Sequence, residues 1–160
     1  MEKVTLLCAG KLKEKYWRDA AAEYVKRLSA YCNLDILEIK DEKTQEHMSP
    51  AEEDALLLKE AEQFLKKLDE RAYVIALDIK GAKMGSEELA DRLERLVTGG
   101  SSRFVFLIGS SVGLHDTVLK KADMRLSFSD LTFPHQLARI MLLEQLYRGY
   151  RIRNGEPYHK

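Results

Sequence analysis

The stretch Leu126-Ser127-Phe128-Ser129-Asp130-Leu131-Thr132-Phe133-Pro134-His135-Gln136 joins the last predicted strand to the last long predicted helix. Its polar and apolar residues follow neither a helical nor a strand period, and Pro134 excludes a regular strand. An apolar-periodic run begins directly after Pro134, so the pattern predicts a strand, an ordered loop and a helix. Open α/β sheets bind ligands at such loops, at the carboxyl ends of strands. An ordinary connection with two buried aromatic side chains fits the same spacing.

Working outward from this loop, hydrophobic periodicity predicts strands that alternate with helices. Residues 104–108 are apolar throughout, which is typical of a central parallel strand buried on both faces. The predicted strands are residues 3–9, 34–39, 73–77, 104–108 and 124–128; the predicted helices are residues 13–29, 50–68, 86–97, 115–122 and 135–151. Ser49-Pro50-Ala51-Glu52 predicts a capping box, and residues 81–85 predict a turn. We therefore expect one α/β domain, residues 1–160, with a mainly parallel sheet and helices on both faces.

The composition is that of a globular protein of one-domain size. Of its 160 residues, 45% are hydrophobic and 32% charged, and no apolar run approaches the roughly 20 residues of a membrane helix. A charged helix follows the short apolar run at residues 4–9, so we interpret that run as a buried strand and not as a secretory signal. Cys8 and Cys32 lack metal-ligand spacing and indicate buried, reduced thiols in a cytoplasmic protein. The four histidines show no zinc spacing, so no metal is expected.

Charge is unevenly distributed along a chain whose net charge is zero. Residues 1–30 hold seven basic and four acidic side chains, and residues 135–160 hold five basic and two acidic ones. Residues 41–70 hold four basic and ten acidic side chains. Basic ends around an acidic middle suggest one side that faces a polyanion and one that faces solvent. Charged surfaces without any partner can show the same pattern.

Two further segments could carry chemistry. Gly109-Ser110-Ser111-Val112-Gly113 follows the central strand and could bring backbone N–H groups close to a ligand, although a plain turn also fits. It matches neither the Walker loop nor the dinucleotide fingerprint, and the chain has no nucleophile elbow. Residues 151–160 mix cations, an aromatic ring and an imidazole, which suit phosphates and base stacking. A disordered tail is the alternative.

The last predicted helix is apolar over more than half of its circumference, which indicates two packing partners. The sheet is one partner, and a second subunit is the simplest choice for the other. Arg139, Glu144 and Arg148 lie among these apolar residues. Salt bridges at the rim of an interface would also account for them.

Several motifs closely resemble the RlmH family of SPOUT-class methyltransferases. They are Gly10-Lys11-Leu12-Lys13-Glu14-Lys15-Tyr16, Phe106-Leu107-Ile108-Gly109, Leu126-Ser127-Phe128-Ser129, Leu131-Thr132-Phe133-Pro134-His135-Gln136, Glu144-Gln145-Leu146-Tyr147-Arg148 and Gly155-Glu156-Pro157-Tyr158-His159-Lys160. The resemblance covers essentially the whole chain. It implies a C-terminal trefoil knot and a homodimer with active sites near the subunit interface. It also implies methyl transfer from S-adenosylmethionine to N3 of a pseudouridine in helix 69 of 23S rRNA, in the assembled ribosome.

The resemblance further implies the residues of the site. The cofactor pocket would comprise Leu77, Gly109, Phe128, Ser129, Asp130, Leu131, Thr132 and Phe133. Ser110 stands where the family usually has a second glycine. His159 and Arg139 are candidates for assisting loss of the N3 proton, with Glu144 as a second base or organiser. Tyr158, Arg148 and Lys160 are candidate substrate-binding residues.

Two other functions remain open at this point. A flavodoxin-like nucleotide-binding domain would bind a nucleotide as a monomer and lack affinity for the methyl donor. A non-catalytic ribosome-binding protein would associate with ribosomes without methylating them.

Overall fold

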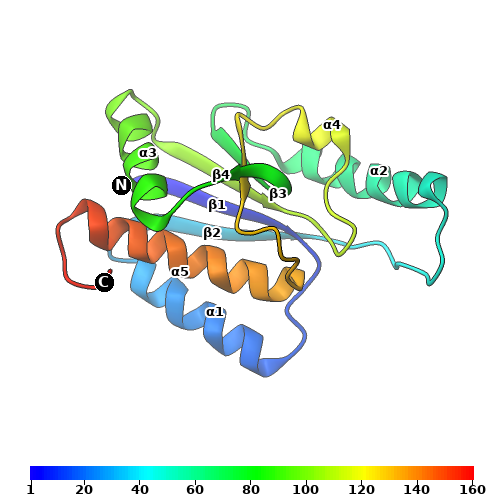
Figure 1. Cartoon of the computed structure of the whole chain (residues 1–160), viewed down its shortest axis with the longest axis horizontal. Coiled ribbons are helices and arrows are strands. Elements are labelled where there is room, and N and C mark those ends of the chain that lie inside the picture. The colour runs from blue at the N-terminus through cyan, green and yellow to red at the C-terminus, as the bar shows by residue number, and fades with distance from the viewer.

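The computed structural model describes residues 1–160 as five strands alternating with five helices (Figure 1). The elements are β1 (Glu2–Ala9), α1 (Lys15–Leu28), β2 (Cys32–Ile39), α2 (Pro50–Lys67), β3 (Tyr73–Lys83), α3 (Ser86–Thr98), β4 (Arg103–Ile108), α4 (Asp116–Leu119), β5 (Met124–Ser127) and α5 (His135–Arg153). The predicted alternation and the capping box of α2 at Ser49 and Glu52 are confirmed. The main boundary differences are a shorter α4 and a β3 that continues to Lys83.

All strand pairs in the sheet are parallel, and the strand order is β2-β1-β4-β3-β5. The connections through α1 and α3 step toward the β2 edge, whereas those through α2 and α4 step toward the β5 edge. Because the two sets of helices lie on opposite faces, every crossover has the same hand, as expected of a doubly wound sheet. β4 is the central strand, as its apolar sequence predicted.

Alternate side chains of the central strands enter two separate hydrophobic cores, one on each face of the sheet. Phe104, Phe106 and Ile108 of β4 pack with α1, α3 and α5, whereas Val105 and Leu107 pack with α2 and α4. The cores differ in size, with 18 buried residues on the α5 face and ten on the α2 face. Continuous apolar runs in β1 and β4 follow directly from this burial on both faces.

β3 is longer than predicted and changes course near its end. The sequence predicted a strand at residues 73–77 and a turn at 81–85, but the strand continues to Lys83. Its pairing with β5 shifts between Leu77 and Ala82, so the intervening residues leave the ladder. Gly81 allows the chain to rejoin, because a Cβ there would lie 2.7 Å from the carbonyl carbon of Arg125. The predicted turn is therefore a bulge inside a pair of strands, which periodicity alone does not distinguish from a turn.

The segment of residues 128–134 carries the chain back across the carboxyl ends of the strands. β5 is at one edge of the sheet, beside β3. The first turns of α5 lie beyond the end of β1, because Arg139 donates a 3.0 Å hydrogen bond to the carbonyl oxygen of Gly10. β5 and β1 are three strand spacings apart, or about 14 Å. The loop that the sequence singled out is thus a crossing of the sheet and not a local connection (Figure 1).

α5 then runs back along the sheet between α1 and α3. Leu142, Leu143, Leu146, Gly149 and Tyr150 are buried there. The second packing partner of this helix is therefore largely supplied by the same chain, which weakens the inference of a second subunit from its apolar circumference. None of the helices combines the length and the apolar character needed to cross a membrane.

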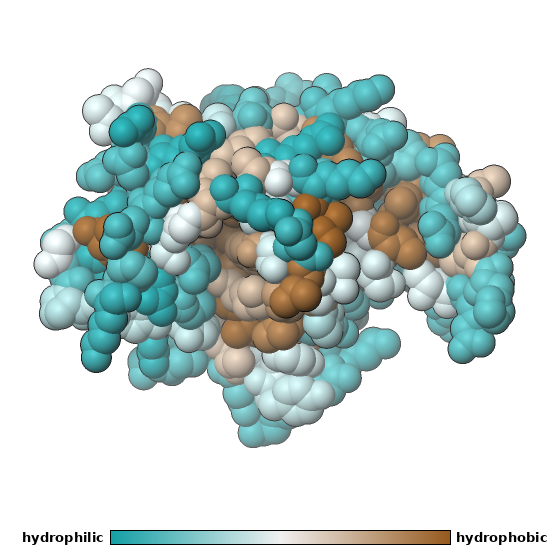
Figure 2. Space-filling view, in the orientation of Figure 1, coloured by the Kyte–Doolittle hydropathy of each residue, from teal (hydrophilic) through white to brown (hydrophobic).

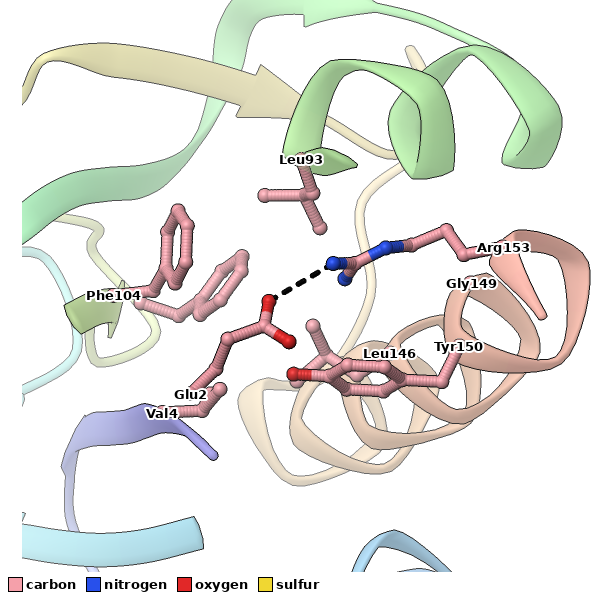
Figure 3. Close-up of a pocket in the computed structure, with 9 residues that line it drawn as sticks. Glu2, Val4, Leu93, Phe104, Leu146, Gly149, Tyr150 and Arg153 are labelled. Atoms are coloured by element: carbon pink, nitrogen blue, oxygen red, sulfur yellow. Dashed lines mark hydrogen bonds and ion pairs between the residues drawn. The ribbon is translucent and has the colours of Figure 1, made fainter. Parts of the chain in front are cut away.

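The amino-terminal end of β1 and the last turn of α5 are joined by an ion pair. Arg153 donates a 3.0 Å hydrogen bond to Glu2, and the two side chains point toward each other beside a small apolar cavity (Figure 3). The cavity of about 10 Å³ has room for about one water molecule. It cannot hold a cofactor, so the ligand site must lie elsewhere.

Replacing Gly81 tests whether the bulge of β3 requires a residue without a Cβ. We expect Gly81→Ala to lower the free energy of unfolding by about 1–3 kcal/mol, because the added methyl overlaps the backbone of β5. Urea unfolding followed by circular dichroism measures the change. Gly85→Ser is the matched control, because a Cβ at Gly85 meets nothing within 4 Å. Equal stability of the Gly81→Ala protein and the native protein would contradict this account of the bulge.

Candidate functional site

A cleft of about 550 Å³ opens at the carboxyl end of the sheet, a size typical of small-molecule sites. Three segments that each follow a strand supply most of its lining. They are residues 77–80 after the regular part of β3, residues 108–114 at the end of β4, and residues 125–129 and 131–133 around the end of β5, with further contributions from Asp116, Leu119, His135 and Ala138. The crossing segment therefore converts three separate strand ends into one concave site.

The walls of the cleft combine apolar side chains with exposed backbone. Leu77, Ile108, Leu126, Phe128 and Phe133 lie among the lining residues. Figure 2 shows hydrophobic residues gathered near the middle of one face, where the end of β3 and the crossing segment lie in Figure 1. Ile79 and Leu131 of these segments are 46% and 70% exposed. Such a surface suits a flat apolar group, with the loop backbone available for hydrogen bonds.

The loop after β4 is a tight turn closed by its own backbone. The N–H of Gly113 donates a 2.9 Å hydrogen bond to the carbonyl oxygen of Ser110. Gly113 has a φ of +93°, a conformation that favours glycine. A Cβ on Gly109 would lie 2.3 Å from the carbonyl oxygen of Gly113. The two glycines thus let the turn fold back on itself and place its backbone at the cleft.

Charged groups also surround the cleft. Asp78 and Arg125 line it and form an ion pair at 3.7 Å. His135 lines it at the start of α5, and burial lowers the pKa of its imidazole, assisted by the charge of Arg139 and opposed by that of Asp41. No group of three or more His, Cys, Asp or Glu side chains gathers where it could hold a metal ion.

Seven of the eight residues predicted for cofactor binding line this cleft: Leu77, Gly109, Phe128, Ser129, Leu131, Thr132 and Phe133. Asp130 is absent from the lining and forms an ion pair with Lys83 at the surface. Sequence reasoning missed Asp78, Arg125 and His135. Asp78 and Arg125 lie within β3 and β5 and His135 begins α5, so no local pattern links them before the strand order is known.

Arg139 is buried beneath the site and does not line it. Its side chain is 3% exposed and forms a 2.7 Å ion pair with Glu38, in addition to its bond to Gly10. Both terminal nitrogens are therefore bonded to the ends of β1 and β2 within the same chain. This geometry suits a role in positioning α5. The predicted contribution of Arg139 to catalysis is a separate matter and stays a prediction.

The other candidate residues form a cluster farther along α5. Glu144 accepts hydrogen bonds from Arg148 at 2.8 Å and from Tyr158 at 3.4 Å. The Arg148 guanidinium lies 4.7 Å from the centre of the Tyr158 ring, and its NH1 lies 3.1 Å from Nδ1 of His159. Because an arginine can only donate, Nδ1 of His159 is the acceptor in this contact, and Nε2 lies 3.3 Å from Glu87 of α3. The tail is therefore ordered on α5, with Lys160 exposed at its end.

The cluster and the cleft are separated within one chain. Ala138 lines the cleft, whereas Arg148 is ten residues later on α5, about 15 Å along the helix axis. The structure thus brings His159, Glu144, Arg148 and Tyr158 together, but not with the cofactor-binding residues.

Comparison with known proteins identifies the relatives of this chain. A protein-family model described as "Predicted SPOUT methyltransferase" matches residues 2–159. "Ribosomal RNA large subunit methyltransferase H" of Clostridium kluyveri is 52% identical over 157 residues, covering 98% of this chain and 99% of the relative. The protein of the same name from Alkaliphilus oremlandii is 54% identical with the same coverage.

Solved structures with much lower identity share the fold. A probable methylase family protein from Haemophilus influenzae superposes with a TM-score of 0.55 at 13% identity, covering 99% of this chain and 70% of its own. A putative methyltransferase from Legionella pneumophila, in complex with the bound cofactor SAM, gives a TM-score of 0.50 at 12% identity, with coverages of 93% and 66%.

The lowered pKa of His135 predicts a pH dependence of stability. Because the folded state resists protonation of this ring, the unfolded state binds more protons below its ordinary pKa of about 6.5. Stability is therefore fully present above that pH and falls as the pH drops through it toward the folded pKa. We expect His135→Gln to flatten this decline between pH 7.5 and 5.5, measured by urea unfolding. The exposed His47, changed to Asn, is the control. An unchanged slope in His135→Gln would contradict the assignment.

Proposed function

The chain belongs to the SPOUT methyltransferase family, and from that premise we propose that it is an S-adenosylmethionine-dependent methyltransferase of large-subunit ribosomal RNA. The observation that carries this proposal is the cleft, which is built from the strand ends where an α/β sheet binds its ligand. Relatives named for this activity match the chain over nearly its whole length. Membership also implies the trefoil knot of the family, with residues 128–134 in the returning part of the chain.

The lining of the cleft fits the proposed cofactor. S-adenosylmethionine supplies an activated methyl group on a positively charged sulfur. Leu77, Ile108 and Phe133 offer apolar walls to an adenine ring, and the backbone of residues 109–113 and 128–133 offers hydrogen bonds to its polar edges. The cleft also has the carboxylate of Asp116, which suits a positively charged group, whereas the carboxylate of Asp78 is paired with Arg125. The residues present therefore fit the cofactor in size, polarity and charge.

We propose N3 of a pseudouridine in helix 69 of 23S rRNA as the target, in the assembled ribosome in the cytoplasm. The net charge of the chain is zero. Arg151 and Arg153 are already engaged in ion pairs. Phosphate contacts are then few and local, so the shape of the ribosome must supply much of the recognition.

The working unit that we propose is a homodimer. The tail of one chain lies about 15 Å along α5 from its own cleft, so a second copy is needed to bring a tail beside a cleft. Leu137 and Met141, which are half-buried on α5, offer an apolar surface for that contact. The complete site would then combine the cleft of one subunit with the tail of the other.

Within that site, each tail residue has a proposed part. His159 takes the N3 proton, once its Nδ1 is released from Arg148. Glu144 is the organiser of the cluster, because its carboxylate already accepts bonds from Arg148 and Tyr158. Tyr158 stacks on or orients the target ring, and Arg148 and Lys160 contact the RNA.

Mass mapping of rRNA nucleosides tests the function directly. Ribosomes lacking the modification are incubated with the protein and S-adenosylmethionine, and 23S rRNA is expected to gain one methyl group on a pseudouridine of helix 69. Free 23S rRNA is the matched control and is expected to gain less. Binding to ribosomes without methylation would instead favour a non-catalytic role.

Gly109→Val should weaken cofactor binding, because its side chain forces the turn after β4 to open. We expect the dissociation constant of S-adenosylmethionine, measured by calorimetry, to rise roughly tenfold or more, with circular dichroism unchanged. Gly85→Ser, at another strand-to-helix connection, is the control. Native affinity in a folded Gly109→Val protein would remove this loop from the site.

His159→Ala should lower the rate constant for methyl transfer by about 100-fold while the affinity for S-adenosylmethionine stays unchanged, as expected of a lost general base outside the cofactor pocket. Single-turnover methylation of ribosomes measures this. Mixing His159→Ala with Gly109→Val subunits tests the dimer. Mixed dimers should regain activity in one of their two sites, whereas no recovery after subunit exchange would contradict a shared site.

A further inference from the structure

Glu60 of α2 is a buried carboxylate beside the smaller hydrophobic core, on the sheet face opposite α5. It is 1% exposed and is bordered on the same helix by the buried Ala61 and Phe64. Burying a carboxylate is costly, whereas an apolar side chain at the same place would add to the core. Stability alone therefore does not account for an acid at this position, and its contacts indicate another role.

Each oxygen of Glu60 accepts one hydrogen bond from a loop at the carboxyl end of the sheet. The hydroxyl of Ser110 donates to Oε1 at 2.7 Å, and the backbone N–H of Glu42 donates to Oε2 at 2.9 Å. The bond from Glu42 fixes the carboxylate, and the carboxylate in turn fixes Ser110. The pKa of Glu60 is raised overall, because burial and the charges of Asp41 and Glu42 outweigh the two hydrogen bonds, which favour the ionised form.

Ser110 lines the cofactor cleft, whereas Glu60 does not. The turn that contains Ser110 lies between Gly109 and Gly113, two residues whose backbone freedom would otherwise allow many conformations. A charge-assisted hydrogen bond is among the stronger contacts available to hold such a turn. It is the hydroxyl of Ser110, which a glycine would lack, that makes this contact possible.

We propose that Glu60 is a positioning residue that holds the cofactor loop, residues 109–113, in its binding conformation through the hydroxyl of Ser110. This inference rests on the proposed use of S-adenosylmethionine by the same cleft. Glu60 contributes through the loop and does not contact the cofactor. The same carboxylate connects the loop after β2 to the loop after β4.

Glu60→Met and Glu60→Gln separate this role from a structural one. We expect Glu60→Met to weaken binding of S-adenosylmethionine about tenfold, as expected when a charge-assisted hydrogen bond is lost, while its unfolding temperature is equal to or above that of the native protein. Glu60→Gln should bind almost as tightly as the native protein, because its amide can bond to both Ser110 and Glu42. Phe64→Leu, a change in the same helix, should lower the unfolding temperature without affecting binding.

Ser110→Ala removes the same hydrogen bond without changing the core. If Glu60 acts through Ser110, the double variant Glu60→Met/Ser110→Ala should bind S-adenosylmethionine no more weakly than the weaker single variant. Additive losses, or native affinity in Glu60→Met, would overturn the proposal.

Hydrogen exchange of the protein without ligand separates this inference from the proposed function. The amides of residues 110–114 should exchange faster in Glu60→Met than in the native protein, and at the native rate in Phe64→Leu. Unchanged exchange in Glu60→Met would overturn the inference. Failure of the native protein to bind S-adenosylmethionine would instead overturn the proposed function, whatever the exchange shows.

Discussion

The return of the chain across the carboxyl ends of the strands is the constraint on which the site depends. β5 ends at one edge of the sheet, yet α5 must begin beyond β1 to pack between α1 and α3. Residues 128–134 therefore have to cross the ends of β3 and β4, and they cover the loops that follow those strands. Arg139 secures the far end of the crossing by bonding to Glu38 and to Gly10. If this loop did not cross the sheet, the turns at the strand ends would remain separate and would form no cleft.

Local sequence patterns predicted the elements well because each pattern has a local physical cause. The apolar residues 104–108 gave the central strand, and Ser49 with Glu52 gave the capping box of α2. Strand order has no such local signal, so the bulge at Gly81 was predicted as a turn, and Asp78, Arg125 and His135 were missed. The resemblance to a family supplied the cofactor residues, of which Asp130 alone does not line the cleft. Arg139 was predicted to assist loss of the N3 proton as a cation, and that prediction is untested; its burial could not be predicted, because it depends on contacts more than a hundred residues away.

The fold also gives a spatial meaning to the uneven charge of the sequence. α1 and α5, which belong to the two basic ends, pack against each other on one face, and α2, which belongs to the acidic middle, covers the other. Although the net charge of the protein is zero, the face of α1 and α5 comes from the basic ends of the chain and suits a polyanion better than the face of α2. Many of the cations are paired within the chain. Lys11 and Lys13, however, are exposed directly after Gly10, at the carboxyl end of the sheet, where the cleft also lies.

The fully buried polar side chains are concentrated at the carboxyl end of the sheet, where they fix loop conformations although apolar side chains would be more stabilising. Glu60, Ser127 and Arg139 are the polar or charged residues that are fully buried, and all three lie at the carboxyl end of the sheet. Each bonds to a loop: Glu60 to those after β2 and β4, Ser127 to the crossing segment, and Arg139 to the turn after β1. Apolar replacements would bury more favourably but would leave these loops without fixed conformations. Since the rest of the core is apolar, this concentration of buried hydrogen bonds is best explained by the need for a cleft whose loops are already in place when a ligand arrives.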